Sequence, residues 1–356
     1  MTAFTIDDVT IPDNISATDA KDFIDAVEVG NTVEATGYGT TDLNYEPVEE
    51  LPRFHDPHQP SRMLVARLGG RIVGRGIYET QAGDQADSAW IIAEVLPEFR
   101  RQGIGTALSD TLEAIAASEG KKKALVFTPL PSLSPHQLPS PTGFGSVDAD
   151  HADTKFLLSR GYRLEQIERA SRLTLPVDGL AALVADAERR SGAEYLTHCW
   201  VGRTPERWLE GIAHLSTRMS TDAPTAGLEE PEDVWTVERV VEADDRHERL
   251  NPRTYVVAAV EHLPSARLVG FTVLSVPPQV GRAADQYATL VVREHRGHRL
   301  GMLLKVANLA HLERVAPGHP SVITFNAEEN RHMLDVNEAV GFVPIASESA
   351  WRKDLG

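Results

Sequence analysis

One segment of this 356-residue chain occurs twice, and this repeat limits the possible folds more than any other feature of the sequence. The segments AEVLPEFRRQGIGTAL, at 93–108, and TLVVREHRGHRLGMLL, at 289–304, align with an offset of 196 residues. Each follows a strand-like run and precedes a helix-like run. A repeat of this length is too long for a solenoid unit. We therefore expect two copies of one domain, at residues 1–176 and 177–356.

Both copies show the same order of predicted elements. Two strand-like runs of the first copy, at 63–68 and 71–78, flank Gly69-Gly70, which is typical of a hairpin. A further strand then leads into an amphipathic helix at 103–118. The second copy repeats this order over residues 254–340. Strands that alternate with helices predict an α/β (α+β) fold, in which helices cover both faces of each sheet.

Composition excludes several classes of function. The chain has 35 Lys and Arg against 52 Asp and Glu, a net charge of −17, so we expect neither nucleic acid nor a membrane as a partner. Cys199 is the only cysteine, which excludes an intrachain disulfide and a cysteine-based zinc site. The first residues lack the basic and apolar regions of a signal peptide, and no apolar run is long enough to span a membrane. We expect a cytoplasmic protein without a metal.

A basic, glycine-containing turn, RRQGIG at 100–105, joins the strand and the helix of the first copy. Glycines let the backbone approach a ligand closely, and the start of the helix adds unpaired N–H groups and partial positive charge. The sequence lacks the lysine of a P-loop and the third glycine of a dinucleotide-binding turn. One such motif alone favours a tight turn with surface arginines. Its occurrence at the same place in both copies favours a seat for a pyrophosphate.

Both copies resemble the GCN5-related N-acetyltransferases, or GNATs. Arg100-x-x-Gly103-x-Gly105 resembles the motif with which this family binds the pyrophosphate of acyl-CoA. The block at 330–342 is similar to the family's closing N-x-x-A-x-x-L-Y-E-x-x-G-F helix. Two such domains in one chain are similar to the tandem, mycothiol-synthase-like acetyltransferases of actinobacteria. The resemblance implies, in each domain, a mixed, mostly antiparallel twisted sheet with helices on both faces.

The resemblance also implies an activity. The family uses acetyl-CoA as the donor and an amine as the acceptor, with direct transfer in a ternary complex and without a metal. We therefore expect an N-acetyltransferase that acts on a primary amine of a small molecule, as a monomer or homodimer. Arg299 stands where the first copy has Gly103, and this departure favours an alternative from another class, a non-catalytic acyl-CoA-binding or scaffold protein.

The residues that the resemblance assigns to acetyl-CoA lie at the strand end and the following turn of each copy, with two asparagines added in the second copy. In the first copy they are Val95, Leu96, Arg100, Arg101, Gln102, Gly103, Ile104, Gly105 and Thr106; in the second they are Val291, Val292, Arg296, Gly297, His298, Arg299, Leu300, Gly301, Met302, Asn326 and Asn330.

Amide formation needs a neutral amine, so the site needs a group that accepts a proton. In the family that both copies resemble, this group often lies on the strand that leads into the motif, on the face of the motif's valine. Because strand side chains alternate between two faces, the face of Val291 also carries Thr289, Tyr287 and Asp285. The corresponding positions of the first copy are apolar: Ala93, Ile91 and Ala89. We therefore expect the second domain to be catalytic and the first to bind acyl-CoA without catalysis.

A third catalytic candidate, Asn337, stands where the family usually has the tyrosine that protonates the leaving thiolate. An amide is no acid, but a thiolate whose pKa is about 8.5 leaves without full protonation. The candidates are thus Asp285, Tyr287 and Asn337. Two of them have a structural alternative, since Asp285 fits a solvated turn and Tyr287 fits a core aromatic whose hydroxyl is bonded.

Overall fold

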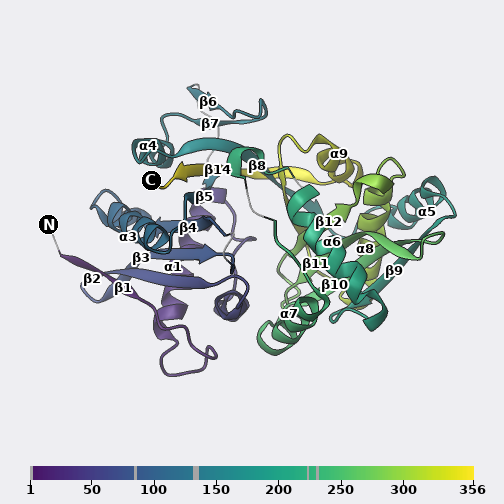
Figure 1. The fold of residues 1–356 in the computed structure, drawn as a ribbon, viewed down its shortest axis with the longest axis horizontal. Helices are drawn as coiled ribbons and strands as arrows, with labels where there is room; N and C mark the ends of the chain where they lie inside the picture. Colours follow the sequence, from purple (N-terminus) through teal and green to yellow (C-terminus); the bar gives the residue numbers. More distant parts are fainter. Residues whose placement is uncertain (1–2, 84–85, 131–135, 223, 230–231) are drawn as a thin grey trace. The chain divides into compact units, whose positions relative to one another are not determined.

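The computed structural model describes residues 3–83, 86–130, 136–222, 224–229 and 232–356. The chain divides into two compact units, and Figure 1 labels most of their helices and strands. The first unit comprises Met1–Glu168, Thr225–Pro231 and Ala346–Gly356, and the second comprises Arg169–Pro224 and Glu232–Ile345.

The first unit begins with a strand and a long helix, and the repeated strand–turn–helix follows. Its strands are β1 (Phe4–Asp8), β2 (Ser61–Leu68), β3 (Arg71–Thr80), β4 (Ser88–Val95), β5 (Lys123–Leu130), β6 (Gln137–Pro139) and β7 (Ser146–Asp148). Its α-helices are α1 (Lys21–Tyr38), α2 (Pro47–Glu50), α3 (Ile104–Ser118) and α4 (Ala152–Ser159). Short 3-10 turns are η1 (Leu51–His55), η2 (Pro97–Phe99) and η4 (Ala226–Leu228).

The main sheet of the first unit has the order β1-β2-β3-β4-β5-β14, where β14 is Val343–Asp354. Neighbouring strands are antiparallel except β4 and β5. That parallel pair has only three paired positions, and the last is Trp90 opposite Leu125. Beyond this point the two strands diverge, which leaves a gap in the sheet between 91–95 and 126–129.

Two helices cover opposite faces of this sheet. The side chains of Leu108 and Leu112 on α3 lie directly against Gly74 and Gly76 of β3. Between these glycines, Arg75 points to the other face, where its guanidinium lies against the backbone of α1. The sheet thus has an α3 face and an α1 face, and the gap between β4 and β5 connects them.

The second unit repeats the plan. Its elements are α5 (Leu180–Ser191), β9 (Tyr195–Val201), η3 (Glu206–Trp208), α6 (Leu209–Asp222), α7 (Val237–Leu250), β10 (Thr254–His262), β11 (Arg267–Val276), β12 (Ala284–Val291), η5 (Arg293–His295), α8 (Leu300–Val315), β13 (Ser321–Ala327) and α9 (Arg331–Val340). Its sheet has the order β9-β10-β11-β12-β13-β8, where β8 is Arg163–Thr174. Strands β12 and β13 of this sheet are parallel neighbours that pair at two positions.

The structure confirms the predicted fold of two domains with mixed, mostly antiparallel sheets. The two copies agree in backbone detail, because the Leu96 N–H donates to Val73 O over 3.0 Å and the Val292 N–H donates to Val269 O over the same distance. These four residues are related by the offset of 196 that the sequence shows.

The units differ from the contiguous halves 1–176 and 177–356 expected from the sequence. Strand β8 passes from the first unit to the second after Glu168, and β14 passes from the second to the first after Ile345. The reason is strand pairing, since Ser347–Asp354 pair with β5 and complete the sheet of the first unit. The last strand in the sheet of the first unit is therefore β14, which follows α9 of the second unit in the chain. The last strand in the sheet of the second unit is β8, which follows α4 of the first.

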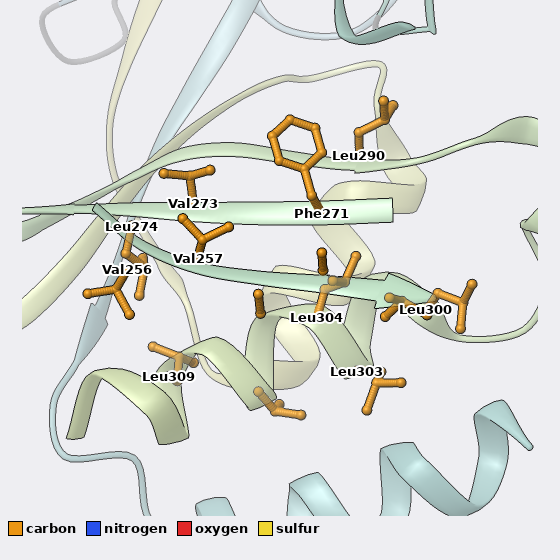
Figure 2. Packing of buried hydrophobic residues seen from close by; sticks show 14 of the residues in the cluster. Val256, Val257, Phe271, Val273, Leu274, Leu290, Leu300, Leu303, Leu304 and Leu309 are labelled. Atoms are coloured by element: carbon orange, nitrogen blue, oxygen red, sulfur yellow. The ribbon is translucent and has the colours of Figure 1, made fainter. Parts of the chain in front are cut away.

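The core of the second unit lies mainly between α8 and the sheet. Figure 2 shows Leu304 pointing from α8 toward the strands, whereas Phe271 and Leu290 project from the opposite face of the sheet. Phe271 and Leu290 are 6% and 5% exposed and belong to the same apolar cluster. Both faces of this sheet are thus packed with apolar side chains.

Candidate functional site

A cavity of about 690 Å³ occupies the gap between β4 and β5 in the first unit. Residues 91–95 of β4 and 126–129 of β5 form its sides. The turn before α3 lines it on the α3 face, together with Ser109 and parts of α4, and residues of α1 line it from the other face. The cavity therefore runs through the sheet where the strand pairing has stopped.

The turn between β4 and α3 gives the cavity a wall that is suited to an anion. Arg101 and Gly103 have positive φ angles of 64° and 87°, and Nε of Arg100 donates to the Val95 carbonyl over 3.1 Å. Gly103 is the residue before α3, and no side chain caps this helix. Because the first N–H groups of a helix have no partner within it, they are free to bind a phosphate here.

The residues of this turn fit a pyrophosphate. A Cβ atom at Gly103 would meet nothing within 4 Å, so the backbone faces open space where a ligand can approach. Among the described residues, neither Arg100 nor Arg101 forms an ion pair with a carboxylate. Of the residues assigned to acetyl-CoA in this copy, Val95, Arg100, Arg101, Gly103, Gly105 and Thr106 line the cavity, whereas Leu96, Gln102 and Ile104 do not.

A buried ion-pair network lies on the α1 face. Nε of Arg75 contacts Oε2 of Glu94 at 2.6 Å, and Nη2 of Arg75 contacts Oε1 of Glu34 at 3.3 Å. The side chains of Arg75 and Glu94 are 5% and 10% exposed, and that of Glu34 is 30% exposed. A buried guanidinium needs such partners because an unpaired buried charge is strongly destabilising.

Tyr38 and Glu348 extend this network. The hydroxyl of Tyr38 donates to Oε2 of Glu348, and Tyr38 lies one helical turn after Glu34, so the two side chains share a face of α1. Glu34, Glu94 and Glu348 all line the cavity. Three carboxyl groups therefore surround its α1 end, where Arg75 supplies a neighbouring positive charge.

This crowding changes the protonation of Glu34. Burial raises the pKa of the Glu34 carboxyl to about 8, and the negative charge of Glu94 adds to the rise, while Arg75 opposes it. Burial also raises the pKa of Glu348, although the hydrogen bond from Tyr38 acts in the opposite direction. A carboxyl group that titrates near neutral pH is suited to accept and release a proton.

The two ends of the cavity therefore differ in chemistry and lie on opposite faces of the sheet. Val95 pairs with Gly74 and Ala93 pairs with Gly76, and these glycines face α3. Glu94, between Ala93 and Val95, points to the α1 face. One end carries helix N–H groups and arginines, and the other end carries carboxyl groups.

The second unit builds the same turn with a different placement of glycine. Gly297 and Arg299 have φ angles of 88° and 56°, at the positions that Arg101 and Gly103 hold in the first unit. Nε of Arg296 donates to the Val291 carbonyl over 3.2 Å, as Arg100 does to Val95. Both units thus have a left-handed backbone at the same two positions. The glycine stands at the second of these positions in the first unit and at the first of them in the second unit.

The arginines of this second turn are partly neutralised. The side chain of Asp222 is 1% exposed and contacts Arg218 at 2.8 Å, Arg293 at 3.4 Å and Arg296 at 3.4 Å. Arg296 was expected to face a phosphate. Because Asp222 already holds it, the second turn offers less positive charge to an anion than the first.

Asp285 and Tyr287, the expected base candidates, have separate surroundings. Oδ2 of Asp285 accepts a hydrogen bond of 2.7 Å from Nη2 of Arg253, whose side chain is 3% exposed. Tyr287 is 70% exposed, and its ring stacks on Tyr255 with 5.8 Å between the centroids. Asp285 is thus held in an ion pair, and Tyr287 is not a core residue.

The strand alternation on which these candidates depended is interrupted. The pairing of β11 with β12 shifts register between Val273 and Leu274, which places Tyr287 in a bulge. Nε2 of Gln286 donates to Oγ1 of Thr272, which also contacts Oγ1 of Thr289. Gln286, and not Tyr287, therefore shares the hydroxyl of Thr272 with Thr289.

The asparagines of the second unit bond to one another or to the backbone. Asn337 is 1% exposed and its Nδ2 donates to Oδ1 of Asn326 over 2.6 Å. Oδ1 of Asn337 has no hydrogen-bond partner within the described part of the chain. Asn330 caps α9 by accepting from the Met333 N–H. Asn326 and Asn330 thus have structural partners of their own.

The other residues assigned to acetyl-CoA in the second copy divide between core and surface. Val292 and Leu300 are buried, 6% and 2% exposed. Gly297, His298 and Arg299 are exposed, and Val291, Gly301 and Met302 are intermediate.

Within the described ranges, no group of three or more His, Cys, Asp or Glu side chains is arranged to hold a metal ion. Over the same residues, no helix is both long and apolar enough to cross a membrane.

The acidic end of the cavity was not foreseen from the sequence. Glu34 and Tyr38 continue the helical spacing of the buried residues Ala26 and Gly30. A carboxylate within this apolar stripe is therefore the one sequence feature that could have indicated the acidic end. Glu94 is a single charge inside an otherwise apolar strand. Pairing each of them with Arg75 requires the fold, because 41 and 19 residues separate them in sequence.

Comparison with known proteins shows similarity to acetyltransferases. Residues 32–132, a span that includes most of α1 and all of β2 to β5, match the model of the Acetyltransferase (GNAT) family. A curated relative, the mycothiol acetyltransferase of Salinispora arenicola (strain CNS-205), is 27% identical over 341 residues, which cover 94% of this chain and 95% of the relative.

Solved structures share the fold over the whole chain. A tandem GNAT protein from the clavulanic acid biosynthesis pathway superposes with a TM-score of 0.70 and 23% identity, covering 99% of both chains. A GCN5-related N-acetyltransferase from Sphaerobacter thermophilus has a TM-score of 0.62 and 12% identity, and covers 99% of this chain and 96% of that one.

The raised pKa of Glu34 predicts a pH-dependent effect on stability. Between about pH 4.5 and pH 8 the folded protein holds a proton that the unfolded chain has released, so Glu34 reduces stability increasingly as the pH rises through this range. We expect the melting temperature of Glu34→Gln, relative to wild type, to increase from pH 5 to pH 8 by about 2 °C or more. Glu28→Gln, at an exposed position of the same helix, is the control. A constant difference across this range would contradict the raised pKa.

Proposed function

We propose that this chain, which is similar to a GNAT family model, to a mycothiol acetyltransferase and in fold to a tandem GNAT protein, is an N-acetyltransferase that transfers an acetyl group from acetyl-CoA to a primary amine of a small molecule in the cavity of the first unit. Transfer is direct, with both reactants bound at once. The observation that carries this proposal is that a single cavity joins the anion-binding turn to the carboxyl groups.

The α3 end of the cavity suits the donor. Acetyl-CoA, when bound, supplies an acetyl thioester that an amine can attack. The N–H groups at the start of α3 and the guanidinium groups of Arg100 and Arg101 would hold its pyrophosphate. Residues of the two diverging strands would then flank the arm that leads to the thioester, because they line the gap between the two faces.

The α1 end suits the acceptor. An alkyl amine is mostly protonated at pH 7, and carboxyl groups attract it in that form. Glu34 then accepts a proton from the bound ammonium, which leaves the nitrogen lone pair free to attack the thioester carbonyl. The C–N bond forms as the C–S bond breaks, and the CoA thiolate that leaves takes up the proton that the amide nitrogen loses. Glu94 remains paired with Arg75 and contributes charge, while Tyr38 holds Glu348 in place.

The second unit lacks this pairing of charges. The residues 196 positions after Arg75 and Glu94 are Phe271 and Leu290, and both are buried in the apolar core (Figure 2). The sequence led us to expect catalysis in the second domain, through Asp285, Tyr287 and Asn337. That expectation stays a prediction, and the geometry supports the first unit better.

The position of the donor predicts the effect of a side chain at Gly103. Gly103→Val places a branched side chain where the pyrophosphate would approach, and we expect the Kd for CoA to rise at least about tenfold, or about 1.4 kcal/mol. Gly120→Val is a matched control, because Gly120 also has a positive φ and open surroundings but does not line the cavity. Calorimetric titration of both full-length variants measures this. Equal weakening by the two substitutions would refute the placement of the donor.

The role of Glu34 predicts a loss of turnover. With an amine panel and a thiol-release assay, Glu34→Gln should lower kcat by about 10²-fold, whereas Glu28→Gln on the same helix should not. The base must be deprotonated to act, so kcat/KM of the wild type should rise with pH up to about pH 8 and then level off.

The opposite pattern would assign the chemistry differently. If Glu34→Gln retains turnover while Asp285→Asn or Tyr287→Phe abolishes it, the second unit is catalytic. If CoA binds but no amine of the panel is acetylated at any pH, the result favours a non-catalytic acyl-CoA-binding protein.

A further inference from the structure

Lys305 is a buried lysine that the proposed reaction does not use. It lies on α8 and is 1% exposed, which places it among the most deeply buried side chains of the described chain. Burial lowers the pKa of its amino group to about 7. A lysine is rarely buried in this way, because taking an ammonium out of water is costly. Its position therefore needs a physical explanation.

The residue at the corresponding position of the first unit is Ser109, 196 positions earlier. Ser109 lies on α3 one turn after Gly105, and Lys305 lies on α8 one turn after Gly301. Ser109 lines the cavity of the first unit. A short hydroxymethyl group on α3 is thus replaced on α8 by a side chain with four methylene groups and an amine.

The contacts of Lys305 place its amino group in the space that corresponds to the cavity. Nζ of Lys305 lies 5.5 Å from the centroid of the Phe342 ring. Phe342 corresponds to Tyr162 at the offset of 180 that relates the closing helices, and Tyr162 lines the cavity of the first unit. Nζ also lies 3.4 Å from Oε1 of Gln286 on β12, beyond the last pair of β12 with β13.

We propose that Lys305 fills the slot of the second unit in which the arm of an acyl-CoA would lie, so that one chain binds one acyl-CoA molecule, in the first unit. This inference rests on the proposed function, because it assumes that the first unit holds the donor. The ion pairs of Asp222 with Arg293 and Arg296 weaken the second turn independently.

The stoichiometry of CoA binding tests this inference. Calorimetric titration of the full-length wild type with CoA should give one site per chain. Lys305→Ser, which introduces the residue of the first unit, should give two, with the added site weaker because Asp222 still holds Arg296. Lys305→Met keeps the slot filled without the charge and should keep one site. In the reverse exchange, Ser109→Lys should remove the site of the first unit.

Two sites in the wild type, or a single site in a folded Lys305→Ser variant, would overturn the inference. If Lys305→Ser does not fold, the Ser109→Lys variant provides the test. Undiminished CoA binding by Ser109→Lys would then overturn the inference. If the wild type has one CoA site and Gly103→Val does not weaken it, the donor binds in the second unit. This result would refute the proposal that Lys305 fills the slot of the second unit, but it would not refute acetyl transfer by the chain. No CoA binding by the wild type would refute the proposed function itself.

Discussion

The short parallel pairing of β4 with β5 is the constraint on which the proposed site depends. The strands pair at three positions only, and then diverge. Divergence exposes backbone and side chains on both sides of a gap, so a ligand can pass through a sheet that is otherwise continuous. It also brings the start of α3, on one face, into the same cavity as Glu34 and Tyr38 of α1 on the other. A single interruption of strand pairing thus joins two chemically different surfaces.

The two copies show how one backbone plan acquires different properties through a few side chains. Both retain the left-handed positions of the turn and the hydrogen bond from its first arginine to the strand end. The polar pair of Arg75 and Glu94 is replaced by Phe271 and Leu290, and Ser109 is replaced by Lys305. Arg75, Glu94 and Ser109 leave a cavity with buried charge in the first unit. The larger or apolar side chains at the same positions of the second unit fill the corresponding space. The fold is therefore shared, while the chemistry depends on side chains.

The sequence predicted the parts of the structure that local pattern determines. The repeat, the hairpin around Gly69-Gly70 and the helix that begins after Gly103 all follow from spacing and glycine positions, and the structure contains them. The exchange of β8 and β14 between units could not be predicted, because it depends on pairing between β5 and a strand more than 200 residues away.

The candidate site was harder to predict than the fold. The face of β12 was assigned by strict alternation, which the bulge at Tyr287 interrupts. Glu94 lies on the opposite face of β4, which alternation from Val95 does not include. The pKa of Glu34 depends on Glu94 and Arg75, which approach it only in the folded chain. Such effects follow from tertiary contacts and leave little trace in the local sequence.

Hydrogen–deuterium exchange of the full-length protein, with and without saturating CoA, tests the central claim most directly. Binding in the gap of the first unit should slow exchange in peptides that cover 91–95 and 100–109, and should leave peptides that cover 296–305 unchanged. Protection that is confined to 296–305 would contradict the account, because it would place the cofactor in the unit that Lys305 is proposed to close.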